Sequence, residues 1–400
     1  MVNSRLRRLK VEMEEELASI LDWWQDNTMD RANGGFYGRI DGANTIVEEA
    51  EKGVILNTRI LWAFSAAANT TKSEKYGQIA DRAYDYLCEY FLDKKNGGLY
   101  WMLDFKGKPV DLKKQIYAQA FGIYGFTEYY QLRKNSQSLK LAVELYHLID
   151  RFSLDPIYGG YFEAFTENWK RMEDVRLSEK DENEVKTMNT HLHILEAYTN
   201  LCRVNPTDTI KASLKNLILC FIDKFIDLKS NHLHLFFDER WVSKSEAVSY
   251  GHDIESSWLL LEATEVLGDK TLIKKAKAIA IRMAHVTIEQ GMDSNGGLHY
   301  EKEYYFLDRE KHWWVQAEAV IGFFNAYQIS GYEKYLKAAM DCWNFIKTHI
   351  RDTNSGEWFW SVSQSGVANK KNDKAGPWKA PYHNGRMCLE LIQRLSAFKM

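Results

Sequence analysis

The sequence predicts an all-α protein, an (α/α)6 barrel of six helical hairpins with short β-hairpin loops at one end. Three observations predict this fold. A turn followed by aromatic residues occurs six times, two kinds of helical segment alternate between the copies, and only 5 prolines occur in 400 residues. No composition break or low-complexity linker divides the chain, so we expect residues 1–400 to form a single barrel domain.

The repeated turn is clearest where two glycines precede aromatic residues, as in Gly34-Gly35-Phe36-Tyr37. This pattern predicts a tight turn that leads into a short strand. The six copies, of which the fourth and sixth are degenerate, begin at Gly34, Gly97, Gly159, Leu233, Gly296 and Gly356. The repetition predicts one hairpin loop for each pair of helices.

The helical segments fall into two sets. Amphipathic segments with one charged face cover 5–27, 74–92, 138–153, 209–228, 270–289 and 333–350. Segments that are apolar or small almost all round cover 54–69, 114–132, 185–203, 251–267, 312–329 and 381–397. Because a helix that is apolar on every side must be buried, we expect the second set to form an inner ring and the first an outer ring.

The inner segments carry polar and aromatic residues near their N-terminal ends. These are Arg59, Tyr117, Gln119, His191, His193, His252, Glu255, Trp314, Glu318 and His383. If the inner helices run parallel, these side chains converge at one end of the barrel, where helix N-termini add partial positive charge. A convergent set of titratable groups in a concave site predicts an active site.

Each candidate also has a structural alternative. His252 and Glu255, spaced i, i+3, would suit a core histidine with its carboxylate partner, and His383 would suit a helix cap. Arg59 would suit a buried ion pair. His191 and His193 lie two residues apart and point to different faces, so at most one faces the lumen, and we favour His193.

Two other groups of residues have plain structural interpretations. The tryptophans 313, 314 and 378 would suit the core. The charged runs 179–184 and 301–303 are expected to be solvated loop residues.

Several classes of function are not favoured. The chain has no P-loop, no G-x-G-x-x-G, no G-x-S-x-G and no chelating histidine or cysteine spacing, so we expect chemistry by imidazoles with no cofactor and no metal. A net charge of -3 favours neither nucleic acid nor a membrane as partner. Five cysteines without a C-x-x-C pair, no signal peptide and no apolar span predict a cytoplasmic protein, which we expect to be a monomer.

Four motifs carry a resemblance to a known family. They are Met188–Ala197 (MNTHLHILEA), Gly251–Trp258 (GHDIESSW), Trp313–Glu318 (WWVQAE) and Trp378–Asn384 (WKAPYHN). Together they resemble the cellobiose 2-epimerases of the N-acylglucosamine 2-epimerase superfamily, over essentially the whole chain. The resemblance implies an (α/α)6 barrel that reversibly inverts C2 of the reducing-end glucose or mannose in β-1,4-linked disaccharides such as cellobiose, mannobiose and lactose. It implies no metal and no nucleotide.

The resemblance also implies roles for residues. The acid–base pair falls on His252 and His383, the third histidine on His193, and the arginine that stabilises the enolate on Arg59. The residues implied to hold the sugar are Tyr117, Asn189, Glu255, Trp314 and Trp378, and Glu318 is a further candidate for substrate binding. We expect Glu255 to contact His252, orient its ring and raise its basicity.

The chemistry suits these residue types, because a neutral imidazole is an effective base near pH 7 and its protonated partner can return a proton. Three alternatives stay open. A related aldose–ketose isomerase would use the same histidines, and a glycoside hydrolase on the same barrel would use two carboxylates. A sugar-binding protein without catalysis would need only the aromatic side chains, which 13 tryptophans and 22 tyrosines supply in number.

Overall fold

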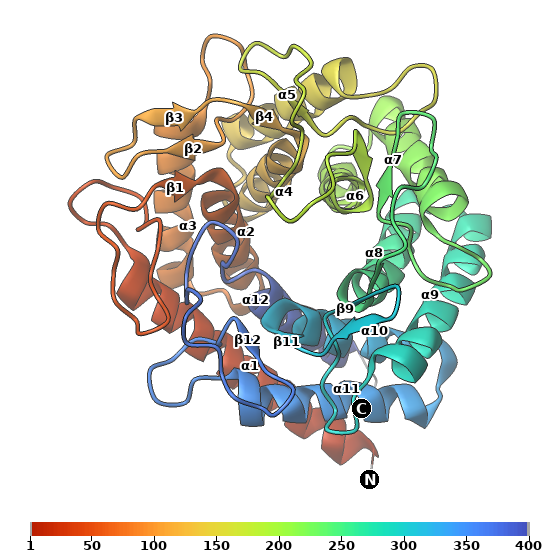
Figure 1. The fold of residues 1–400 in the computed structure, drawn as a ribbon. Coiled ribbons are helices and arrows are strands. Elements are labelled where there is room, and N and C mark those ends of the chain that lie inside the picture. The colour runs from red at the N-terminus through yellow and green to blue at the C-terminus, as the bar shows by residue number, and fades with distance from the viewer. Residues whose placement is uncertain (1, 398–400) are drawn as a thin grey trace.

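Helices dominate the structure, a computed structural model that describes residues 2–397. Within these residues, twelve α-helices form two concentric rings (Figure 1). The inner ring contains α2 (Val54–Thr71), α4 (Ile116–Arg133), α6 (Met188–Val204), α8 (Tyr250–Leu267), α10 (Trp313–Ser330) and α12 (His383–Ala397). The outer ring contains α1 (Val2–Thr28), α3 (Glu74–Tyr86), α5 (Ser136–Phe152), α7 (Asp208–Cys220), α9 (Lys270–Gly291) and α11 (Glu333–Phe345). The predicted barrel is therefore confirmed.

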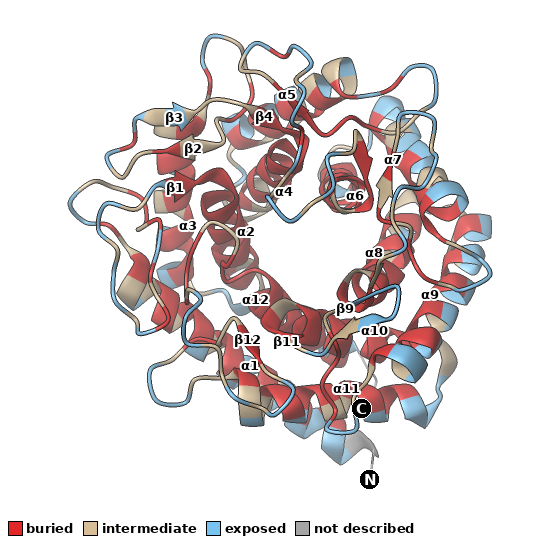
Figure 2. Cartoon of the chain, viewed as in Figure 1, coloured by how far each residue is buried: buried red, intermediate tan, exposed pale blue. Residues whose placement is uncertain are grey.

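Hydrophobicity sorts the helices between the rings. In α2 every residue from Val54 to Ala68 is buried, whereas outer helices are buried only on the side that faces the inner ring (Figure 2). The first helix packs against the last, α1 against α12, which closes the ring. Helices α3, α7 and α11 each continue into one π-helical turn, η1 (Leu87–Phe91), η2 (Phe221–Phe225) and η3 (Ile346–Ile350). Among the described helices none combines the length and the apolarity of a membrane span.

Short antiparallel strands lie at the end of the barrel where the inner helices begin (Figure 1). They form three-stranded sheets ordered β1-β2-β3 and β10-β9-β8 and the pairs β4-β5, β6-β7 and β11-β12. Their bounds are β1 (Lys52–Gly53), β2 (Met102–Leu103), β3 (Pro109–Asp111), β4 (Lys114–Gln115), β5 (Ala164–Phe165), β6 (Lys186–Thr187), β7 (Phe236–Phe237), β8 (Val248–Ser249), β9 (Glu301–Glu303), β10 (Phe306–Asp308), β11 (Lys311–His312) and β12 (Ser361–Val362).

Four inner helices begin later than predicted, one of them by the single residue His312, which belongs to β11. Residues 114–115 and 186–187, expected to open helices, belong to β4 and β6, where Lys114 pairs with Phe165 and Lys186 with Phe237. The last inner helix begins at His383 rather than at 381. Apolar periodicity could not reveal these starts, because the pairing partner of each strand lies in a distant hairpin.

The six predicted turns each close a hairpin with a single β-bridge, such as Met29 with Phe36 and Leu92 with Leu99. Gly35 has a φ of 59° and lies so close to the Tyr86 ring that a Cβ would stand 2.6 Å from it. Asn231 and Glu357 take the left-handed conformation in the two degenerate copies. The pattern of small residues thus marked the turns correctly.

An ion pair between a buried lysine and a buried or partly buried aspartate recurs beside five of these turns, a feature that the sequence patterns did not reveal. In each pair the aspartate opens the turn and the lysine precedes the next inner helix, for example Lys114 Nζ at 2.8 Å from Asp93 Oδ2, both fully buried. The other pairs are Lys52–Asp30, Lys186–Asp155, Lys311–Asp293 and Lys374–Asp352. These pairs tie each hairpin to the start of an inner helix.

Candidate active site

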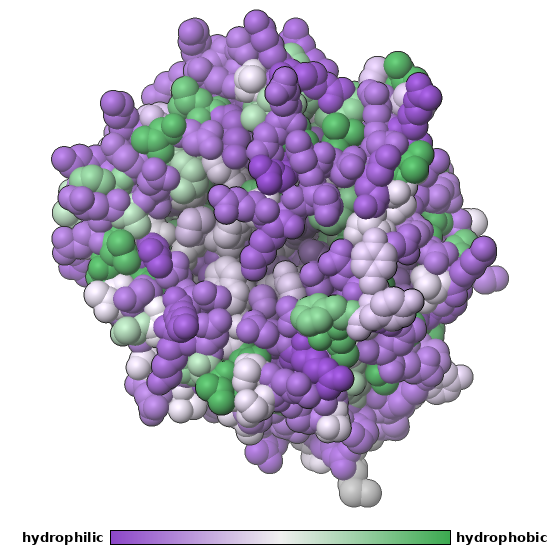
Figure 3. Space-filling view, in the orientation of Figure 1, coloured by the Kyte–Doolittle hydropathy of each residue, from purple (hydrophilic) through white to green (hydrophobic). Residues whose placement is uncertain are grey.

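A cavity of about 440 Å³ opens at the end of the barrel where the inner helices begin. This volume lies in the range of small-molecule sites, about 300–1,000 Å³. Figure 3 shows the corresponding hollow at the centre of a largely hydrophilic face. Nine of the residues singled out in the sequence line it together: Arg59, Tyr117, Asn189, His193, His252, Glu255, Trp314, Trp378 and His383.

Arg59 is buried in α2 without a carboxylate partner within the described part of the chain. One Nη donates to the hydroxyl of Tyr117 at 2.7 Å and the other to the main-chain oxygen of Trp378 at 3.0 Å. Its guanidinium carbon lies 4.4 Å from the centre of the Phe121 ring. A buried cation held only by neutral groups beside a cavity is poised to bind an anion. Among the described residues, Arg59 therefore does not form the buried ion pair that the sequence allowed as an alternative.

Of the two histidines on α6, His193 lines the cavity, as the sequence favoured. Its Nδ1 lies 3.0 Å from the Glu196 carboxylate, so Nε2 is left for the cavity. His191 faces away from the cavity: its Nδ1 donates to the Thr187 carbonyl at 2.7 Å and its Nε2 accepts from the Tyr161 amide at 2.8 Å. With both ring nitrogens engaged by the main chain, His191 is structural.

His252 lies in the first turn of α8. Its Nδ1 is 2.8 Å from the hydroxyl of Ser249, and its ring packs against Trp314 at 4.8 Å between centroids. Burial lowers the pKa of His252 to about 3, with a further decrease from His193 nearby. The imidazole is therefore neutral at pH 7 and can act as a base.

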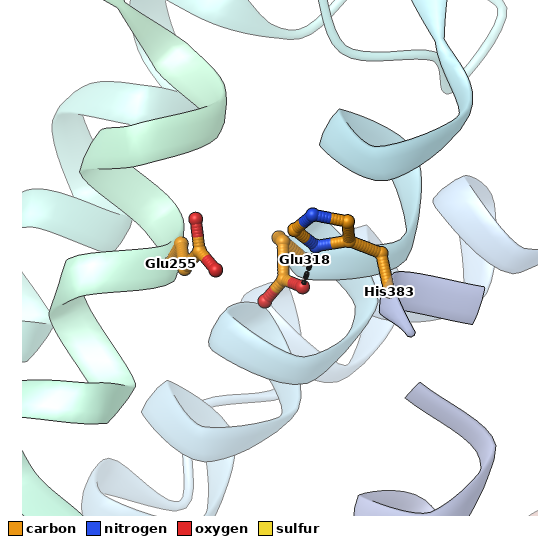
Figure 4. Close-up of side chains that lie close together, drawn as sticks. All are labelled: Glu255, Glu318 and His383. Carbon is orange, nitrogen blue, oxygen red and sulfur yellow. Dashed lines mark hydrogen bonds and ion pairs between the residues drawn. The ribbon is translucent and has the colours of Figure 1, made fainter. Parts of the chain in front are cut away.

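His383 begins α12, and its Nδ1 lies 2.7 Å from Oε1 of Glu318 (Figure 4). Burial lowers the pKa of His383 well below its usual value, and the nearby Arg59 and Arg386 lower it further. Trp314 contacts this imidazole too, at 5.6 Å between ring centroids. His252 and His383, which are far apart in sequence, thus both contact the ring of Trp314.

Arg386, which no sequence pattern marked, is the centre of a buried polar network behind the histidines. Its guanidinium donates to Glu196, Glu255 and Glu318 and to the Tyr382 hydroxyl. Burial opposes the charge, but the surrounding carboxylates raise the pKa of Arg386 well above its usual value. Its position three residues after His383, like that of Glu196 three after His193, is the sequence signal that could have revealed both residues.

One predicted contact is not formed, and one candidate for substrate binding lies behind the cavity wall. Glu255 was expected to contact His252, but it accepts from Arg386, and Ser249 is the partner of His252 instead. Glu318 was expected to bind substrate. It is fully buried and lies behind His383, where it also accepts from Trp258 Nε1 at 3.1 Å. Both carboxylates accept from the charged guanidinium of Arg386, a donor that helical spacing alone does not identify.

Glu255 and Glu196, which both accept hydrogen bonds from Arg386, differ in their ionisation. Burial raises the pKa of Glu255 to about 7, and repulsion from Glu318 adds to this increase. Burial would also raise the pKa of Glu196, but Arg386 and His193 reverse this and lower it to about 2. Glu196 is therefore ionised throughout the neutral range, whereas Glu255 titrates within it.

The cavity wall includes residues that the sequence did not mark. Tyr300, His312 and Trp360 line it, and the Tyr300 and His312 rings stack at 3.9 Å between centroids. Trp313, interpreted above as a core residue, lines it too. The run 179–184 was interpreted as solvated, which is wrong for Asp181. Its carboxylate accepts from the Ser178 amide and hydroxyl at 2.8 and 2.9 Å, it lines the cavity, and burial raises its pKa.

Within the described residues, one group of three side chains has donor atoms close enough together to bind a metal ion. The donor atoms of Glu255, Glu318 and His383 all lie within 4.8 Å of one another (Figure 4). Both carboxylates already accept from Arg386, whose guanidinium supplies the positive charge that buried carboxylates require. The donor set is therefore satisfied within the protein itself.

Comparison with known proteins identifies relatives along nearly the whole chain. The profile of the N-acylglucosamine 2-epimerase (GlcNAc 2-epimerase) family matches residues 35–385. The cellobiose 2-epimerase of Bacteroides fragilis is 49% identical over 387 residues, which cover 96% of this chain and 98% of the relative. That of Dictyoglomus turgidum is 41% identical over 392 residues, covering 98% and 100%. The solved structure of cellobiose 2-epimerase from Bacillus thermoamylovorans B4167 superposes with a TM-score of 0.93 at 43% identity, over 97% of this chain and 100% of that one.

Proposed function

The chain belongs to the N-acylglucosamine 2-epimerase family and is a sugar epimerase, and on this premise we propose that it inverts C2 of the reducing-end glucose or mannose of β-1,4-linked disaccharides. Cellobiose, mannobiose and lactose are the substrates we propose. The substrate class is taken from the cellobiose 2-epimerases that the chain resembles over nearly its whole length.

One observation carries the chemistry: the imidazoles of His193, His252 and His383 face the same cavity as Arg59, an arginine with no carboxylate partner among the described residues. The C2 proton of a sugar becomes acidic only in the open-chain form, where the aldehyde can accept the electrons. The C2–H bond then breaks, its proton moves to Nε2 of one imidazole, and the electrons form the enediolate. Arg59 would stabilise the new oxyanion.

Inversion requires that the proton return to the opposite face of C2. We assign His252 and His383 to this exchange, because both contact Trp314 and both present Nε2 to the cavity. The protonated imidazole on the second face would complete the product. A single base with rotation of the intermediate would give the same outcome.

The remaining lining residues suit a carbohydrate. Trp314 and Trp378 are half-buried, and Trp313 and Trp360 lie beside them, so that several indole rings surround the cavity. Such rings cover the apolar faces of sugar rings at little cost in conformational entropy. Tyr117, Asn189 and Glu255 supply polar contacts for hydroxyl groups.

The experiment that tests this function is proton NMR of cellobiose and mannobiose incubated with the protein. We expect glucosyl-mannose from cellobiose and mannosyl-glucose from mannobiose, with the glycosidic bond intact. Release of free glucose would favour a glycoside hydrolase, and a fructose-ended product would favour an aldose–ketose isomerase.

We also propose that the reaction needs no cofactor, because Arg386 neutralises the carboxylates that would otherwise attract a metal ion. Dialysis against a chelator is expected to leave the rate of epimerisation unchanged. A loss of rate that a divalent cation restores would refute this proposal.

A further inference from the structure

Ser249 occupies the N-cap position of α8, yet its side chain makes no cap hydrogen bond. An N-cap serine ordinarily accepts from an amide in the first turn of its own helix. Thr187 does so for α6 and Thr207 for α7. The hydroxyl of Ser249 lies instead 2.8 Å from Nδ1 of His252. The hydroxyl of Ser249 therefore contacts an imidazole of the cavity instead of capping its own helix.

His193 and His383, the other two histidines assigned to the reaction site, have a different kind of partner. Nδ1 of His193 faces Glu196, and Nδ1 of His383 faces Glu318. An ionised carboxylate only accepts hydrogen bonds, so a neutral ring beside it keeps its proton on Nδ1 and presents Nε2 as an acceptor. A hydroxyl both donates and accepts, so the proton of a neutral His252 can sit on either nitrogen.

We propose that Ser249 is a positioning residue for His252, an inference that rests on the proposed epimerase reaction. Its hydroxyl holds the ring with Nε2 toward the cavity and leaves that nitrogen free to accept or to donate. Reversible inversion needs such a group, because whatever removes the C2 proton in one direction must deliver it in the other. Unlike the carboxylates beside Nδ1 of His193 and His383, the hydroxyl orients the ring without fixing the position of its proton and without a negative charge that would favour the imidazolium.

The position of Ser249 is itself fixed by the fold. The residue is almost fully buried, and its strand β8 pairs with β9 through Ser249 and Glu301. The charged and titratable groups that share a cavity wall with His252 come from other elements as well. They are Arg59 on α2, Tyr117 on α4, His193 on α6, Glu255 on α8, Tyr300 before β9, His312 in β11, His383 on α12, and Arg176, Glu179, Lys180, Asp181, Glu182 and Glu184 in the loop before β6. The hydrogen bond from Ser249 is the contact that reaches Nδ1 itself.

Three variants test the proposal through kcat, KM and the pH dependence of kcat/KM. Ser249→Ala is expected to lower kcat roughly tenfold with little change in KM, because Nδ1 is left without a partner. Ser249→Thr keeps the hydroxyl and is expected to restore most of the rate. Ser249→Asp places a carboxylate beside Nδ1 and favours the imidazolium, so activity should be lost on the acid side about one pH unit higher than in the unaltered protein.

The matched control is Thr207→Ala, which removes a conventional N-cap from an outer helix. It should lower the melting temperature and leave the pH profile unchanged. A Ser249→Ala protein with normal kcat, or a Ser249→Asp protein with a normal pH profile, would overturn the role of Ser249. Failure of the unaltered protein to epimerise any disaccharide would instead refute the proposed function, so the two failures are distinguishable.

Discussion

The imidazoles on α6 and on the first turns of α8 and α12 have different surroundings despite their common chemistry. His252 and His383 present one free ring nitrogen to the cavity, whereas both nitrogens of His191 bond to the main chain. Replacing a proton carrier should therefore affect rate, and replacing His191 should affect stability.

His252→Asn and His383→Asn are each expected to lower turnover by about 10²–10⁴-fold while the protein stays folded, since general acid–base groups contribute this much. Turnover of cellobiose and incorporation of solvent deuterium at C2 measure the effect. His191→Asn, as the control, should lower the melting temperature and still exchange the C2 hydrogen. Near-normal turnover in either of the first two variants would remove that residue from the mechanism.

Arg59 gives a second prediction at the same cavity. Arg59→Gln is expected to lower kcat by about 10²–10³-fold, as the loss of one oxyanion donor does. Since Arg59 neutralises no carboxylate among the described residues, its removal strands no buried charge, and thermal unfolding should change little. Arg133→Gln, at the ion pairs with Glu74 and Asp81 outside the cavity, should retain normal kcat. Equal activity of both variants would contradict the role of Arg59.

The hairpins that carry the inner helices depend on buried ion pairs. Lys114→Met would leave the Asp93 carboxylate buried without its cation, which is expected to destabilise the fold by about 3–5 kcal/mol. Lys75→Met, at the half-exposed pair with Asp22, should cost less than about 1 kcal/mol. Denaturant unfolding of both variants measures the difference, and equal losses would show that burial of the pair is unimportant.

The same pair predicts a pH dependence. Burial would raise the pKa of Asp93, but Lys114 and the amides of Asn96 and Lys95 lower it to about 2, from an ordinary value of 3.8. The folded state thus binds this proton less tightly than the unfolded chain. The contribution to stability is complete above about pH 4 and is lost as the pH falls toward 2. Asp93→Asn should flatten the stability curve in that window, measured by unfolding at successive pH values.

The barrel closes on itself, because α1 at one end of the chain packs against α12 at the other. We therefore propose that residues 1–400 unfold as one domain. Calorimetry is expected to give a single transition whose calorimetric and van't Hoff enthalpies agree. Two separated transitions would indicate independent domains.

Local patterns in the sequence were sufficient for the architecture. All-round apolarity assigned each inner helix, since a helix without a polar face has no stable place at the surface. Paired glycines marked turns because the left-handed conformation at positions such as Gly34 favours a residue without a side chain. The spacing of two between His191 and His193 separated a structural histidine from one in the cavity. The family motifs then pointed to the residues that line the site.

What the tertiary structure alone decided is the partner of each buried charge. Arg386 joins carboxylates from α6, α8 and α10, which the chain supplies from three distant segments. Helical spacing suggested that Glu255 contacts His252, but Glu255 accepts a stronger, charged hydrogen bond from the Arg386 guanidinium. The partner of His252 is therefore Ser249. Sequence specifies which helices are buried because hydrophobicity is a property of each segment. Charge pairing depends on which segments meet, and only the closed ring determines that.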